Sequence, residues 1–291
     1  IGDADDGYAL SPGLRISWQE NRQTRVARSY PVAGLSLDRD PERDHRLIFL
    51  HNPLGMAPGY GHGHADCLSV IFRHAGVDLL IDPGTGQYGG AAEYRRYFRS
   101  ALGHNTATVD GADYAEQAGA FLWRGPYQPE SLQADFDADG CVLLVRHDAF
   151  RKQRVTHHRG VAYRPGRFLA VWDHFAGAEG HDVRLHWHLG CVPASCDLAA
   201  GRIELVAGAK RVLLEVSGAT VTLSEGSQDP LLGWQSRRYG SLDPCPTVEL
   251  TADPTASSDQ VLTVLWLGKP EPIAVLDPWV AGFAARITVQ I

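Results

Sequence analysis

Short runs of β-branched and aromatic residues recur along the chain between glycine, proline and Asp-Gly breakers, while helical periodicity is scarce. This alternation is typical of an all-β protein, so we expect fewer than about one residue in six to be helical. The runs that we expect to form strands are 46–51, 68–74, 77–82, 106–110, 142–147, 168–174, 183–189, 212–216 and 261–267.

Local signals predict the connections between some of these strands. Ala75-Gly76 and Asp110-Gly111 have the composition of two-residue hairpin turns. One short helix is expected over 91–99, where Ala, Glu, Tyr and Arg follow a spacing that a helix tolerates.

The pattern divides the chain into three parts. Residues 1–30 are polar and aperiodic, which predicts an extended lead-in or linker. Residues 31–192 contain the clustered ionisable side chains and are expected to form an antiparallel β-sheet domain. Residues 193–291 have more regular strands without such clusters, which indicates a C-terminal β scaffold subdomain.

Composition narrows the class of partner. The 291 residues suffice for a buried core, and the net charge of −7 argues against a nucleic-acid partner, which requires a clustered positive surface. The apolar fraction of 44% and the lack of an 18-residue apolar run argue against a membrane protein. Five cysteines without a C-x-x-C pair indicate neither a disulfide framework nor a thiolate zinc site. Because the chain begins with Ile and has no signal sequence, we expect a fragment or processed form.

A cluster of histidine and aspartate residues carries the candidate chemistry. His62 and His64 alternate, Asp82 follows an apolar strand, and His104 opens the next one. Imidazole and carboxylate are the ligands of catalytic zinc, which keeps one position open. For His64 to meet Asp82, residues 61–66 must curl back over the sheet, and the glycines in this segment permit the bend. The alternative is that these residues are separate surface histidines and a turn aspartate.

Other histidine pairs carry less information. His186 and His188 share one face of a strand and can ligate a metal, but the surrounding alternation favours packing. His157 and His158 are adjacent and point apart, which we interpret as a solvated turn.

Three motifs in order resemble the C-terminal region of the heparinase II/III-like polysaccharide lyases and of the related oligoalginate lyases. They are Gly-His-Gly-His-Ala-Asp-Cys-Leu-Ser at 61–69, Leu-Leu-Ile-Asp-Pro-Gly at 79–84 and Tyr-Phe-Arg-Ser-Ala-Leu-Gly-His-Asn-Thr at 97–106. The resemblance implies stacked antiparallel β-sheets, β-sandwich-like in arrangement. In the family these follow an N-terminal α/α toroid that is missing from this sequence, and the active site lies between the two. Residues 2–7 resemble the end of that toroid.

The resemblance also implies roles for single residues. A zinc ion would be bound by His64, Asp82 and His104, and His62 matches an active-site histidine. Tyr97 matches an active-site tyrosine, with Tyr88 as the alternative. The residues that the toroid contributes in the family have no counterpart here.

The activity implied is β-elimination at a uronic acid of an acidic polysaccharide, by a periplasmic or secreted enzyme. Such a reaction requires a base, an acid and neutralisation of the sugar carboxylate. A basic tyrosine requires positive charge nearby, which zinc or Arg95, Arg96 and Arg99 can supply. Two alternatives remain open. One is a metal-dependent glycan hydrolase that uses Asp66 or Glu93 as base. The other is a non-catalytic carbohydrate-binding or scaffold module.

Overall fold

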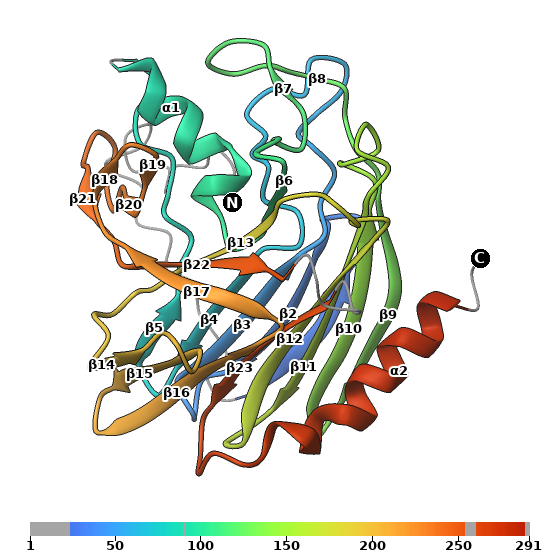
Figure 1. Cartoon of the computed structure of the whole chain (residues 1–291), viewed down its shortest axis with the longest axis vertical. Coiled ribbons are helices and arrows are strands. Elements are labelled where there is room, and N and C mark those ends of the chain that lie inside the picture. The colour runs from blue at the N-terminus through green and yellow to red at the C-terminus, as the bar shows by residue number, and fades with distance from the viewer. Residues whose placement is uncertain (1–23, 90, 254–259, 289–291) are drawn as a thin grey trace.

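The first strands of the protein form an antiparallel meander. The computed structural model describes residues 24–89, 91–253 and 260–288 (Figure 1). The meander is a five-stranded sheet in sequence order, made of β1 (Val26–Tyr30), β2 (Leu35–Asp40), β3 (His45–Leu50), β4 (Val70–His74) and β5 (Val77–Leu80). Arg25 links the edge of this sheet to the next, because its guanidinium binds Asp38 and donates to the backbone carbonyl oxygens of residues 137, 138 and 140.

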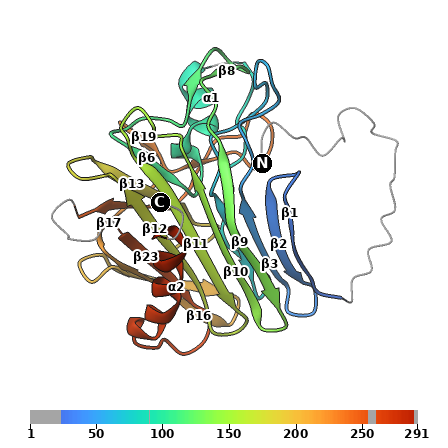
Figure 2. The ribbon, with the colours of Figure 1, turned by 90° about the vertical axis from the view of Figure 1, so that its right-hand side faces the viewer.

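An eight-stranded antiparallel sheet forms the largest layer, in the order β14-β15-β16-β23-β12-β11-β10-β9. Its strands are β9 (Pro129–Asp137), β10 (Gly140–His147), β11 (Thr156–Arg164), β12 (Phe168–Ala176), β14 (Ser195–Asp197), β15 (Arg202–Ala207), β16 (Lys210–Ser217) and β23 (Gln260–Trp266). Helix α2 (Asp277–Thr288) covers an apolar part of the outer face, to which β10, β11, β12 and β23 contribute (Figures 1 and 2). There Phe283 stacks on Trp172, with ring centroids 5.6 Å apart.

A four-stranded sheet and several short elements complete the fold. The sheet has the order β17-β22-β13-β6, with β6 (Ala107–Val109), β13 (Val183–His188), β17 (Ala219–Ser224) and β22 (Thr247–Ala252). Helix α1 (Ala92–Arg99) and the 3-10 turn η1 (Ala101–Gly103) lead into β6. The two-stranded ribbons are β7 (Glu116–Gln117) with β8 (Trp123–Arg124), β18 (Ser227–Gln228) with β19 (Leu231–Leu232), and β20 (Trp234–Gln235) with β21 (Asp243–Pro244).

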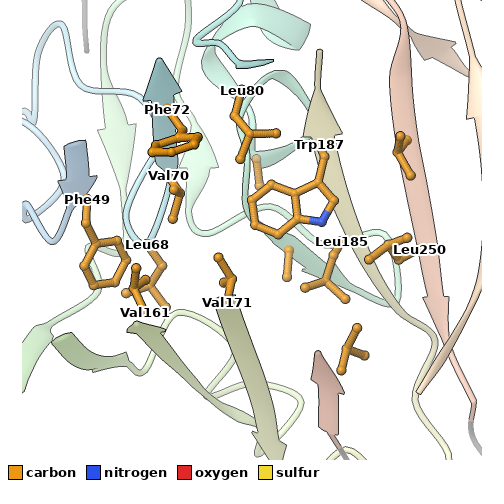
Figure 3. Close-up of a cluster of buried hydrophobic side chains, with 14 of the residues drawn as sticks. Phe49, Leu68, Val70, Phe72, Leu80, Val161, Val171, Leu185, Trp187 and Leu250 are labelled. Carbon is orange, nitrogen blue, oxygen red and sulfur yellow. The ribbon is translucent and has the colours of Figure 1, made fainter. Parts of the chain in front are cut away.

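The three large sheets share one hydrophobic core (Figure 3). Phe49 and Phe72 enter it from the five-stranded sheet, Val171 from the eight-stranded sheet, and Trp187 and Leu250 from the four-stranded sheet. At about 1.5–3 kcal/mol for each large apolar side chain removed from water, this shared core stabilises the relative positions of the sheets.

The all-β prediction with stacked antiparallel sheets and short helices is confirmed. Each of the nine predicted runs overlaps a strand, and the helix expected over 91–99 is α1. Ala75 and Gly76 have positive φ angles of 48° and 82°, as the predicted hairpin turn between β4 and β5 requires. Helix α2 was not predicted.

Two features of the structure concern the boundaries of the predicted three-part division. Residues 1–23 lie outside the described residues, and so does the 2–7 motif, whereas 26–30 form strand β1. Strands from both sides of the predicted boundary at 193 pair in the eight-stranded sheet, since β16 and β12 both bond to β23. No helix among the described residues has the length and apolar character needed to span a membrane.

Candidate functional site

The segment between β3 and β4 curls back over the sheet, as the interpretation of a shared site required. Tyr60 and His62 have positive φ angles of 51° and 60°. The backbone N–H of His62 donates to the carbonyl oxygen of Phe121 at 3.2 Å. Gly63 approaches the neighbouring backbone so closely that a Cβ atom there would lie 2.7 Å from the nitrogen of Gly55. A glycine is therefore required at position 63 for the curl to close.

The structure brings the three predicted metal ligands together. Nδ1 of His64 lies 3.2 Å from Nε2 of His104, and Nδ1 of His104 lies 3.1 Å from Oδ2 of Asp82. Both histidines are buried, and Asp82 also accepts a hydrogen bond from the backbone N–H of Gly84 at 2.9 Å. The aspartate thus lies at the strand end predicted for it, next to one of its two predicted partners.

Hydrogen bonding constrains the proton positions in this cluster. Because a carboxylate only accepts, Asp82 favours the tautomer of His104 with its proton on Nδ1. The lone pair of His104 is then on Nε2 and faces Nδ1 of His64. The other ring nitrogen of His64, Nε2, lies 3.5 Å from Oγ1 of Thr85, and this oxygen accepts a hydrogen bond from Arg95 at 2.9 Å.

The donor set fits zinc in chemistry and partly in arrangement. Two donor atoms bound to one tetrahedral zinc at about 2.1 Å are roughly 3.4 Å apart, close to the 3.2 Å that separates the nitrogens of His64 and His104. Asp82 and His64 contact opposite nitrogens of His104, so no three His, Cys, Asp or Glu side chains of the described residues converge on one point. Asp82, as placed, corresponds to a carboxylate that orients a ligating imidazole.

An aromatic surface lies beside this cluster. The rings of His62 and Tyr88 both pack against Phe121, with centroids 5.2 and 5.3 Å from it. His62 is exposed and Tyr88 is half-buried. The guanidinium of Arg95 lies 5.2 Å from the Tyr88 ring centroid and 5.5 Å from that of Phe121. The exposed side chain of Tyr239 also packs against Tyr88, and their ring centroids are 5.3 Å apart.

Tyr97 lies apart from this surface. Its side chain is buried, and its hydroxyl oxygen is 3.2 Å from Nε2 of His188 and 3.3 Å from the backbone nitrogen and carbonyl oxygen of Trp234. Burial raises the pKa of the Tyr97 hydroxyl, although hydrogen bonds from the Trp234 region oppose this. Burial also lowers the pKa of His188 well below its usual range. The structure therefore places Tyr97 as a neutral hydrogen-bonded core residue.

A buried ionic group supports the loop that carries His104. Arg159 pairs with Asp173 at 2.7 Å and donates to the carbonyl oxygens of Leu68 and Asn105, at 2.7 and 2.6 Å. Burial opposes ionisation of Asp173, but Arg159 and His157 hold its pKa below the usual range. Arg159 on the eight-stranded sheet thus holds the two segments that follow His64 and His104 in the sequence.

The expectation of a solvated turn at His157 and His158 is wrong. Both side chains are buried in the middle of the eight-stranded sheet, on strand β11. His157 is stabilised there by Asp173, whose Oδ1 lies 2.6 Å from its Nε2. Sequence reasoning also missed Phe121, Thr85 and Asn105. Asn105 follows His104 directly in the third motif, which was the one available signal.

The chain matches the family described as heparinase II/III-like, C-terminal, over residues 22–263. Because this match spans most of the sequence, the chain belongs to the heparinase II/III-like family, whose C-terminal region it represents. No curated protein sequence matches the chain significantly.

Solved structures of similar fold include heparinases. A heparinase III described as the BT4657 gene product superposes with a TM-score of 0.67 at 15% identity, over 89% of this chain and 38% of its own. The heparan sulfate lyase HepC from Pedobacter heparinus gives 0.66 at 14% identity, over 91% of this chain and 39% of its own. A further heparinase III gives 0.63 at 17% identity, over 81% and 36%. The chain thus spans less than two fifths of these proteins, and at such identities the similarity establishes the fold.

Proposed function

We propose that the chain is the β-sheet part of a polysaccharide lyase that cleaves a uronic-acid-containing acidic polysaccharide by β-elimination. The observation that carries the proposal is the exposed aromatic surface on which His62 and Tyr88 meet around Phe121, next to Arg95 and the buried histidine cluster. Acidic polysaccharides of this kind occur outside the cytoplasm, so we expect a periplasmic or secreted enzyme.

Tyr88 and His62 have different roles in the proposed reaction. Tyr88 removes the proton beside the sugar carboxylate, and Arg95 is the cation that a tyrosine base needs at its ring. His62 donates to the carboxylate, where negative charge develops, or protonates the leaving glycosidic oxygen. Tyr97 was the first choice for the tyrosine, but its buried hydroxyl is committed to His188 and Trp234, so we assign the role to Tyr88.

Zinc is part of this proposal as a structural cofactor. His64 and His104 would bind it, with Asp82 as third ligand or as the carboxylate that orients His104. The ion would fix the segment that contains both His62 and His64 and add positive charge beside the aromatic surface. The chain's own residues provide the acid and the base.

The hydrolase alternative has less support. Asp66 is buried and accepts a hydrogen bond from the Asn52 side chain at 2.9 Å, and Glu93 lies exposed on α1.

The test is to incubate the whole protein that carries this chain with uronate polysaccharides. A lyase forms a new chain end with a carbon–carbon double bond that absorbs ultraviolet light. Cleavage that releases reducing ends without this absorbance would indicate a hydrolase, and binding without cleavage would indicate the non-catalytic module.

A further inference from the structure

Two cavities flank helix α1 beside the aromatic surface. The smaller one, here called the α1 cavity, has a volume of about 190 Å³. Its lining includes Tyr88, Ala92, Arg95, Arg96 and Gln117. A larger cavity of about 360 Å³ shares Arg96 and Gln117 with it. The α1 cavity thus adjoins Tyr88 on one side and a second hollow on the other.

The walls of the α1 cavity are fixed by hydrogen bonds between α1 and the 117–120 segment. Arg95 donates to the carbonyl oxygen of Ala120 at 2.9 Å, and Arg99 donates to that of Gly119 at 2.7 Å. The side-chain amide of Gln117 donates to the carbonyl oxygen of Arg96 at 2.9 Å. A cavity held in this way needs little rearrangement to accept a ligand.

The charges around the two cavities differ. Among the described residues that line it, the α1 cavity has two arginines and no acid, whereas the larger one includes Glu93 and Asp113. Arg95 is buried and engaged by Thr85 and Ala120. The Arg96 side chain is exposed, and its guanidinium forms no hydrogen bond or ion pair with the described residues. Its five N–H donors are therefore available to a bound anion.

We propose that the α1 cavity binds the anionic group, a carboxylate or a sulfate, of the sugar unit next to the one that reacts at Tyr88. Arg96 provides the main contact, because a guanidinium matches both oxyanions with two parallel hydrogen bonds. The inference rests on the proposed function for the identity of the ligand as an acidic glycan. It makes Arg96 a specificity-determining residue, since a neutral sugar would leave its charge without a partner.

Binding by the Arg96→Gln variant tests the proposal. Arg286→Gln is the matched control, because Arg286 is also an exposed arginine in the last turn of a helix, on α2 at the other end of the molecule (Figures 1 and 2). The probes, measured by calorimetry on the 291-residue chain, are oligosaccharides of alginate (carboxylate only), dextran sulfate (sulfate only) and dextran (neutral).

The expected result is that Arg96→Gln weakens binding of at least one anionic probe by about tenfold, as the loss of a charge-assisted hydrogen-bonded contact does. Arg286→Gln should bind as the unchanged chain does. The probe that is affected identifies carboxylate or sulfate as the group recognised. Equal binding by Arg96→Gln and the unchanged chain, or no binding of either anionic probe by the unchanged chain, would overturn the inference. Neither result would bear on the lyase proposal, which is judged by the unsaturated product.

Discussion

His62 and Tyr88 pack against the same phenylalanine ring, Phe121, although 26 positions separate them along the chain. The three residues meet because of two hydrogen bonds. The backbone N–H of His62 donates to the carbonyl oxygen of Phe121, and Arg95 on α1 donates to that of Ala120. An exposed imidazole and a half-buried phenol thus share one surface, next to the buried pair His64 and His104.

The first prediction separates the two candidate tyrosines. Tyr88→Phe should lower kcat by about 10²–10⁴-fold, the usual contribution of a general acid or base. Tyr97→Phe should lower kcat far less, but should reduce the free energy of unfolding by about 1–3 kcal/mol, because it leaves buried partners at His188 and Trp234 unsatisfied. Steady-state kinetics and urea unfolding of both variants provide the measurement. A larger loss of kcat in Tyr97→Phe would reverse the assignment.

Metal content provides the second prediction. His64→Ala and His104→Ala should lose zinc after dialysis, as measured by mass spectrometry, whereas the neighbouring His62→Ala should retain it. Asp82→Asn should weaken zinc binding by about 10–100-fold if Asp82 orients His104. Loss of zinc from His62→Ala to the same extent as from His64→Ala would make His62 a ligand.

The third prediction concerns the buried ion pair. Asp173→Asn should lower the free energy of unfolding by about 3–5 kcal/mol, because Arg159 would remain buried without its counter-charge. Asp182→Asn is the control, since the Asp182–Arg184 pair is exposed and should contribute less than about 1 kcal/mol. Urea unfolding measures both. Similar small losses in the two variants would show that Arg159 finds other partners.

Stability should fall in mild acid. Burial lowers the pKa of His45 from 6.5 to about 4, against the opposing effect of Asp38. Between these values the unfolded chain binds a proton that the folded chain does not, so stability is present above about pH 6.5 and is lost as the pH falls toward 4. For His45 alone the loss between pH 7.5 and 5 should be about 2 kcal/mol.

The matched variant for this effect is His45→Phe. It retains a ring to stack on Tyr163, whose centroid is 4.3 Å away, but cannot bind a proton. Urea unfolding of this variant should show a correspondingly smaller loss between the two pH values. An unchanged loss would mean that His45 is protonated in the folded state.

The sequence was sufficient for strands that contain a clear run of β-branched and aromatic residues, such as β4 and β23. The predicted runs left out other strands, among them β2, β11 and β22, as well as β9, whose side chains are mostly exposed, and helix α2. Helix α2 contains Gly282, which weakens local helical preference, and it is stabilised by contacts such as Phe283 with Trp172. Such contacts join segments more than 100 positions apart, and no local pattern encodes them.

For the candidate site, the ordered motifs were sufficient to predict that His64, Asp82 and His104 lie together, but not how. Spacing does not tell which nitrogen of His104 meets which neighbour. Nor does it distinguish Tyr88 from Tyr97, because Tyr97 is buried by His188 and Trp234, which are distant in sequence. Burial of His157 depends in the same way on a partner in another strand, Asp173.

The most direct test of the central claim is the ultraviolet absorbance of products formed from uronate polysaccharides by the whole protein that carries this chain, compared with its His62→Ala variant. We predict unsaturated uronate products from the unchanged protein. The variant should form them at least about 100-fold more slowly, with its zinc content retained. Cleavage without ultraviolet absorbance, or unsaturated product formed at the same rate by His62→Ala, would contradict the account.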